Sequence, residues 1–127
     1  MAWDRAPVAK ALQAVLTAAL DATNVYDRPP QTVNPPAVVI GWPTEVRYSA
    51  AGLGSDEARL PVICVAPADG DDVVSGLIQT VRDAIAGDLT LGGVVQSAVA
   101  AREHNWRAVA VAGIELLQAE VELAIVV

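Results

Sequence analysis

The sequence contains no phenylalanine, and only one cysteine and one histidine among its 127 residues. Because Cys64 is the single cysteine, an intrachain disulfide framework and a four-cysteine zinc or iron–sulfur site are excluded. No stretch approaches eighteen consecutive apolar residues without a charge or a proline, so no membrane span is expected. The first residues lack the basic segment and apolar run of a signal peptide, which makes a soluble, intracellular protein the default expectation.

The charge balance is acidic, with 15 Asp and Glu against 8 Lys and Arg and a net charge of −7. Because phosphate binding depends on clustered Lys and Arg, direct reading of DNA is disfavoured. The apolar residues are mostly small or β-branched, with 24 Ala and 20 Val. Such side chains suit a sheet covered by close-packed helices better than a roomy pocket lined by aromatic rings. A chain of this length is expected to form one globular domain over residues 1–127.

Two segments show the periodicity of amphipathic helices. The first is predicted over Ala6–Ala22, with Asp4 as its N-cap. The second starts in the acidic run Asp69–Asp72, whose carboxylates favour a helix N-terminus, and ends at Gly87. The apolar stripes consist of Val8, Leu12, Val15, Leu16, Ala19 and Leu20 in the first segment, and of Val74, Leu77, Ile78, Val81 and Ile85 in the second.

Most of the remaining chain has the pattern of β-strands. Strands are expected at Ala37–Ile40, Glu45–Tyr48, Leu60–Ala66, Val94–Ala101, Trp106–Ala112 and Ile114–Val127. The proline-rich Asn24–Pro36 predicts an extended, rigid connector, and Ser49–Asp56 predicts a mobile loop or hairpin tip. Pro61 cannot donate to a strand ladder, which places it at an edge or at a strand's start, and Gly113 is the natural turn before the last strand.

These elements predict an α+β fold, with a mixed or antiparallel sheet of about five or six strands and two amphipathic helices packed on one face. In the last segment the odd positions are apolar while Gln118, Glu120 and Glu122 interrupt the even ones, so one face of that strand belongs to the core. Strand character continues to the last residue, so even a short C-terminal truncation should be costly.

No catalytic, cofactor or metal site is predicted. Gly52–Ser55 resembles a phosphate loop, but the following residues predict a strand in place of the helix that such a loop needs. Asp69–Asp72 has the composition of a calcium loop, yet Thr80 stands where the bidentate Glu would be. Cys64 lies inside a predicted strand as a small buried hydrophobe, and His104–Asn105 predicts a solvated turn between two strands.

Five residues are candidates for contact with a partner: Trp42, Tyr48, Leu53, Glu120 and Glu122. Trp42 is an aromatic near a strand end that either anchors a partner or caps the core. Tyr48 and Leu53 belong to the predicted strand and loop that follow it. Glu120 and Glu122 lie two apart on one strand face, where a solvated face or a subunit contact is the expected use.

From Val25 onward the chain resembles the tail terminator, or tail completion, proteins of long-tailed bacteriophages, especially those of actinobacteria. The first of three stretches carrying this resemblance is Val25–Pro30 together with Val33–Val39. The second is Thr90–Val95, and the third is Val111–Glu115 running into Gln118–Val121. Their order and spacing cover about four fifths of the chain, and none of them is a catalytic motif.

The resemblance implies a structural virion protein, assembled in the host cytoplasm, that forms a homohexameric ring at the tail–neck junction. Such a ring would cap the tail tube, end its polymerisation, bind a head–tail connector protein on its other side and let DNA pass through its lumen without specific binding. Sheet edges and the Ser49–Asp56 loop offer a physical route to assembly, by strand addition and by ordering on the tube. The alternatives are another neck protein, such as a stopper or adaptor, and a small ligand-binding protein or enzyme.

Overall fold

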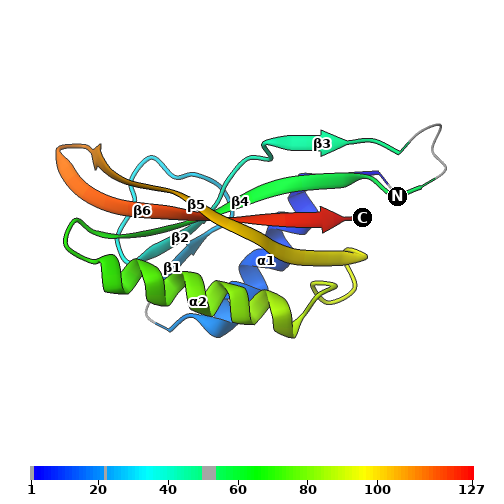
Figure 1. Cartoon of the computed structure of the whole chain (residues 1–127), viewed down its shortest axis with the longest axis horizontal. Helices are drawn as coiled ribbons and strands as arrows, with labels where there is room; N and C mark the ends of the chain where they lie inside the picture. The colour runs from blue at the N-terminus through cyan, green and yellow to red at the C-terminus, as the bar shows by residue number, and fades with distance from the viewer. Residues whose placement is uncertain (1, 22, 50–53) are drawn as a thin grey trace.

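The computed structural model describes residues 2–21, 23–49 and 54–127 (Figure 1). The elements in chain order are α1 (Arg5–Ala19), β1 (Asn24–Tyr26), β2 (Ala37–Ile40), β3 (Glu45–Arg47), β4 (Glu57–Pro67), α2 (Asp71–Gly87), β5 (Ser97–Val111) and β6 (Ile114–Val126). The described residues form two helices and a six-stranded mixed sheet, which confirms the predicted α+β class. Among the described residues, no helix is both long enough and apolar enough to cross a membrane.

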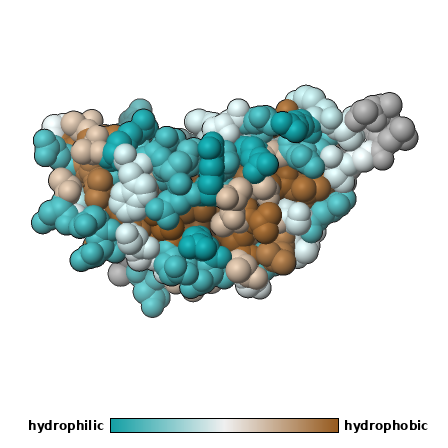
Figure 2. All heavy atoms as spheres, viewed as in Figure 1, coloured by the Kyte–Doolittle hydropathy of each residue, from teal (hydrophilic) through white to brown (hydrophobic). Residues whose placement is uncertain are grey.

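The sheet has the order β1-β2-β4-β6-β5, and β3 also pairs with β4. β1 runs parallel to β2, whereas all the other pairs are antiparallel. β4 pairs with β6 along its whole length, from Glu57 opposite Val126 to Pro67 opposite Leu116. β5 forms one edge of the sheet beside β6 (Figure 1), and in the same view apolar side chains gather between α2 and the first half of β5 (Figure 2).

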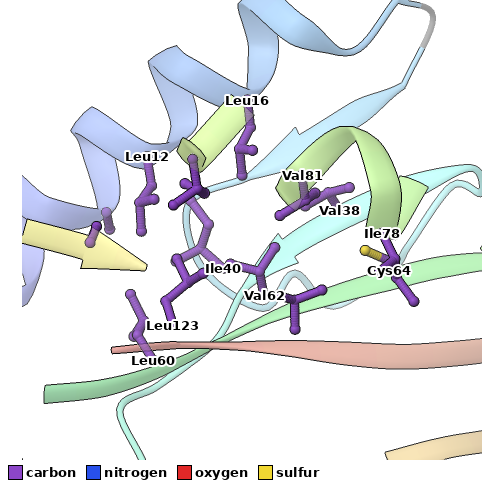
Figure 3. Close-up of a cluster of buried hydrophobic side chains, with 14 of the residues drawn as sticks. Leu12, Leu16, Val38, Ile40, Leu60, Val62, Cys64, Ile78, Val81 and Leu123 are labelled. Atoms are coloured by element: carbon purple, nitrogen blue, oxygen red, sulfur yellow. The ribbon is translucent and has the colours of Figure 1, made fainter. Parts of the chain in front are cut away.

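Both helices cover one face of the sheet, as predicted, and the main core lies between them and the strands (Figure 3). The register explains which strand residues contribute, because residues directly opposite each other share a face. Val38 pairs with Cys64, and Cys64 pairs with Ala119, so all three point towards the helices. The predicted stripes supply the other side: Val8, Leu12 and Leu16 of α1 and Val74, Leu77, Ile78, Val81 and Ile85 of α2 are buried.

Within residues 2–21, 23–49 and 54–127, the opposite face of the sheet carries no helix, and a small apolar cluster lies on it. Ala37, Val65 and Leu116 are its buried members. Tyr26 of β1 and Val33 of the following segment pack against them. The expectation of a plain connector over Asn24–Pro36 was therefore incomplete, because its first residues form β1 and a later one covers part of this face.

The two strands predicted at Val94–Ala101 and Trp106–Ala112 are a single strand, β5, and the solvated turn predicted at His104–Asn105 is wrong. Asn105 has a left-handed backbone with φ of 58°, which is also a common feature of turns. Here it belongs to an irregularity between His104 and Arg107, and a second one lies between Ala100 and Arg102. These are β-bulges, which insert an extra residue and bend a strand without ending it.

The prediction that Pro61 lies at an edge or a strand start was also wrong, since it is the fifth residue of the central strand β4. Its position is explained by the change of neighbour on one side of β4. Residues up to Arg59 pair with β3, and residues from Val62 onward pair with β2. The Pro61 carbonyl accepts from the Gly41 amide at 2.9 Å across this junction. The missing N–H of proline therefore falls where no strand partner requires it.

Candidate functional site

The single thiol and the single imidazole lie on different faces of the sheet. Cys64 pairs with Ala119 and His104 pairs with Glu120, and neighbouring residues of β6 point to opposite faces. Cys64 is buried beside Ile78 of α2 (Figure 3), and this burial raises the pKa of its thiol to about 12, with a smaller contribution from the Glu103 carboxylate. A buried thiol held in its protonated form, on the opposite face of the sheet from the imidazole, has the character of a core residue.

The described residues also offer little to a small ligand or a metal ion. They contain no group of three His, Cys, Asp or Glu side chains placed to hold a metal. Two hollows between α2 and β5 measure about 250 and 240 Å³. Ligand pockets in proteins usually start at about 300 Å³.

Trp42 is exposed, with 58% of its surface accessible, and its ring is held in place by Arg5. The Arg5 guanidinium lies 4.3 Å from the ring centroid, a cation–π distance. The same guanidinium donates hydrogen bonds to the carbonyl oxygens of Asp27 at 2.7 Å, Ile40 at 3.0 Å and Gly41 at 2.9 Å. Burial lowers the pKa of Arg5 from its ordinary value. Trp42 is therefore an exposed aromatic whose ring rests on the Arg5 guanidinium. It does not cap the core.

Arg5 was not among the candidate residues, although the sequence contained a signal for it. It is the first residue of α1, where the positive end of the helix dipole disfavours a cation. An arginine in that position indicates some other use for the charge. Here that use is to join the start of α1 to the ends of β1 and β2 through their carbonyl groups.

The segment around Tyr48 is tied to both ends of the chain through Asp56. The Asp56 carboxylate accepts from the amides of Trp3 at 2.7 Å and Ser49 at 3.0 Å, and these two hydrogen bonds lower its pKa. Its carbonyl oxygen accepts from the amide of Val127 at 3.0 Å. Tyr48, just before Ser49, is 78% exposed, whereas the candidate Leu53 lies outside the described residues. Trp42 and Tyr48 therefore flank β3 as two exposed aromatics.

Glu120 and Glu122 share the face of the sheet that has no helix, as their spacing predicts, but the expected solvated face is wrong for them. They are only 8% and 9% exposed. Arg102 Nε donates to Glu122 Oε2 at 2.9 Å, and Asn105 Nδ2 donates to Glu120 Oε2 at 3.1 Å. Both partners come from the bulged part of β5, which brings them over the carboxylates. The two acids are already paired within the chain.

Among the described residues, the longest strand edge without a ladder partner is the outer edge of β5, a strand that the sequence pattern predicted as two; only near its start does this edge have a partner, where the Ala98 amide donates to the Leu89 carbonyl at 2.7 Å. Among the described residues, β5 pairs only with β6, so one edge of this fifteen-residue strand has no ladder partner. Beyond the end of β4, the β5–β6 hairpin continues alone, and Ile114 near its tip is 61% exposed. A free edge and an exposed tip are features through which proteins add strands and neighbours.

Comparison with known proteins identifies the relatives of this architecture. A family model described as Tail completion protein gp17 matches residues 6–122, which include every helix and strand except the ends of α1 and β6. A search of curated proteins finds no match. Because the family model covers most of the chain, the resemblance to tail completion proteins is confirmed. The chain belongs to the gp17 family of tail completion proteins, and it is a structural protein of bacteriophage tails.

Proposed function

We propose that this protein closes the head-proximal end of the phage tail tube as a ring of six copies, ending tube polymerisation and providing the surface for head–tail joining. The observation that carries the proposal is the family match over residues 6–122. It is supported by a surface that offers exposed aromatics and a free strand edge instead of a ligand pocket. In this proposal the protein works by shape, without catalysis of its own.

Ending polymerisation requires a ring with two different sides. One side of the ring binds the last ring of tube subunits, and the other presents a surface to which a further tube subunit does not bind. Trp42 and Tyr48 flank β3 and form the proposed contact with the tube, because large rigid aromatics dominate the energy of protein interfaces. Glu120 and Glu122 are left out of this contact because their carboxylates already have partners inside the chain.

The acidic charge supports a role around DNA without binding it. Six copies at −7 each carry a formal charge of −42. A lumen surrounded by this charge repels the phosphate backbone on average, so DNA passes without adhering. The proposed location is accordingly the tail–neck junction of the virion.

The test is deletion of the gene from a phage genome, followed by electron microscopy of the particles. The expected result is overlong tails that fail to join heads, with normal tails restored by supplying the protein from a plasmid. Tails of normal length that remain unjoined would favour a stopper or adaptor instead. Tails that are both normal in length and joined would overturn the proposal.

A complementation experiment tests the claim that no catalysis is involved. His104→Ala and Cys64→Ala, supplied separately in place of the wild-type protein, should each restore joined tails of normal length. Loss of joining in a variant that still folds, as judged by circular dichroism, would contradict a purely structural role.

A further inference from the structure

We propose that two copies of the free protein pair through residues 108–111 on the outer edge of β5, the edge segment, with the two strands antiparallel about a two-fold axis at Ala110. The contact extends the sheet from one copy into the other. The inference goes beyond the proposed function and does not depend on it, because a surface that contacts itself closes as a dimer and cannot by itself build a ring.

The outer edge of β5 is protected along most of its length. At its start, the Ala98 amide donates to the Leu89 carbonyl at 2.7 Å. Further along, two irregularities interrupt the ladder with β6 between residues 100 and 107. Bulges of this kind are among the usual devices that prevent strand pairing at an edge. The edge segment contains no bulge, proline or charged side chain, so it is the part of this edge that can accept a further strand.

The backbone of the edge segment directs hydrogen-bonding groups outward at every second residue. A two-residue turn at Ala112 and Gly113, with φ of 52° and 79°, joins β5 to β6. The residues that flank such a turn, here Val111 and Ile114, form a hydrogen-bonded pair, and pairs of this kind alternate along the ladder. The amide and carbonyl of Ala110 therefore point away from β6, where the part of the chain that the structure describes supplies no ladder partner.

The apolar side chains of the hairpin tip share the face opposite the helices. Val109 pairs with Leu116 across the hairpin. Val111 pairs with Ile114 in the same way, and residues directly opposite each other share a face. Leu116 is buried in the small apolar cluster of this face, and both valines pack against that cluster, whereas Ile114 is 61% exposed. The tip therefore has an apolar surface that its own chain covers only in part.

A two-fold axis at Ala110 completes this surface with the same residues of the second copy. The outward amide and carbonyl of Ala110 then meet those of Ala110 in the other copy. Val111 of one copy lies opposite Val109 of the other, because the axis exchanges the two sides of Ala110. Each row across the four strands consists of Ile114 and Val111 from one copy and Val109 and Leu116 from the other. The segment is thus complementary to itself both in its backbone and in its side chains.

The other two edges of the sheet fit the edge segment less well. The Val25 carbonyl of β1 accepts from Gln13 Nε2 of α1 at 3.1 Å, so a helix side chain already uses that edge. β3 is three residues long and has charged side chains on the face opposite the helices. It would place Glu45 and Arg47 beside the two valines. A second copy of the edge segment is therefore the occupant that matches it.

Charge acts on this contact only between the whole molecules. Glu115 pairs with Ala110, so the two copies of Glu115 are three strand spacings apart, or about 14 Å, beyond the screening length of about 8 Å at physiological salt. Each copy carries a net charge of −7, and this charge repels the other copy. The paired segment is also short, whereas a stable interface uses roughly 20–30 residues a side. The dimer is therefore weak, and salt should strengthen it.

Disulfide trapping in the purified protein tests the register. Opposite Cα atoms of a hydrogen-bonded antiparallel pair lie about 5.5 Å apart, within the range of a disulfide. Ala110→Cys should therefore crosslink to its copy under mild oxidation. The matched control is Ala108→Cys, exposed on the same face, because the axis separates the two copies of residue 108 by four residue steps, or roughly 14 Å. Cys64 stays in place because it is buried. Equal crosslinking of the two variants would overturn the proposal.

Sedimentation velocity provides the second measurement. The wild-type protein should shift from monomer to dimer as its concentration rises, and more steeply at high salt. Ala110→Pro should stay monomeric because it lacks the outward amide, and a proline in an edge strand is tolerated where its nitrogen faces solvent. Ala110→Thr, which keeps the amide, should dimerise like the wild type. Circular dichroism verifies that both variants fold.

These experiments need no tails, so their outcome is separate from that of the gene deletion. A wild-type protein that stays monomeric at every concentration would overturn the dimer and leave the proposed function standing. Rings of six that form without the crosslink at Ala110 would also overturn it, because the edge segment would then belong to another contact. Specific crosslinking at Ala110 in a protein whose deletion leaves tails normal would support the dimer and overturn the proposed function.

Discussion

The two faces of the sheet differ in how completely they are closed. On the helix-covered face, Leu60, Val62 and Leu123 pack against α1 and α2 and are inaccessible to solvent. On the other face, the carboxylates of Glu120 and Glu122 lie near the centre with little exposure, and Arg102 of the edge strand donates to Glu122. The comparison teaches that one face holds the fold together while the other is organised by side chains that only partly cover it. Four substitutions test this division, ordered by the size of their expected effect on stability.

The largest effect is expected from Leu123→Ala on the covered face. Leu123 has no accessible surface, and removing a buried leucine side chain leaves a cavity that costs about 2–5 kcal/mol of unfolding free energy. Urea unfolding measures this loss. The matched control is Leu89→Ala, at a half-exposed leucine outside the core, which should change stability by no more than about 0.5 kcal/mol. Equal losses in the two variants would contradict the division between a closed and an open surface.

A smaller effect is expected from Cys64→Ser in the same core. The substitution keeps the size of the side chain but places a hydroxyl among apolar groups, which costs about 1–3 kcal/mol when it finds no partner. Cys64→Ala is the control, because it removes the sulfur without adding a polar group and should cost about 0.5–1.5 kcal/mol. If serine were tolerated better than alanine, the site would have to contain a hydrogen-bond partner and would not be a closed apolar core.

A still smaller effect is expected on the open face from Arg102→Ala. The variant leaves the Glu122 carboxylate without its cation, but Arg102 itself is largely exposed, so solvent screening limits the loss to about 1 kcal/mol or less. Arg28→Ala is the control, since the Arg28–Asp27 pair is longer, at 3.6 Å, and more exposed. It should have no measurable effect. Added salt should reduce the Arg102→Ala loss, and a loss that did not respond to salt would indicate packing instead of charge.

The comparison also explains what the sequence could predict. Helical and alternating periodicity identified both helices, the core stripe of α2 and the inward positions of β6, because these follow from local spacing. The pairing of the two glutamates involves residues far along the chain. Arg102, which donates to Glu122, lies 20 residues from it. Asn105, which donates to Glu120, lies 15 residues from it. Local alternation contains no information on such partners.

The other misses have the same origin. β1 is three residues long and exists through its parallel pairing with β2, and Asn105 has the same local signal in a bulge as in a turn. Of the candidate contact residues, Trp42 and Tyr48 were identified as aromatics near strand ends. The cation–π contact between Arg5 and Trp42 joins two residues that are far apart in the sequence. Only the folded chain brings them together.

The last substitution, Trp42→Ala, combines an effect on stability as small as that of Arg102→Ala with a large effect on function. The ring is exposed on one side and lies on Arg5 on the other, so its loss removes little buried surface and should lower the unfolding free energy by no more than about 1 kcal/mol. Arg5 keeps its three carbonyl partners, which hold the start of α1 in place.

Under the proposed function, however, the variant loses a central anchor of the contact with the tube, and interface tryptophans commonly contribute about 2 kcal/mol or more to binding. Tail lengths measured by electron microscopy after complementation should therefore be abnormal for Trp42→Ala and normal for Trp42→Phe, which keeps a ring over the guanidinium. Val73→Ala, at an exposed apolar residue of α2, controls for a general loss of surface hydrophobicity. Normal capping by Trp42→Ala would mean that the aromatic at the end of β2 is held rigid for the sake of the fold alone, and the tube contact would then have to be sought elsewhere on the molecule.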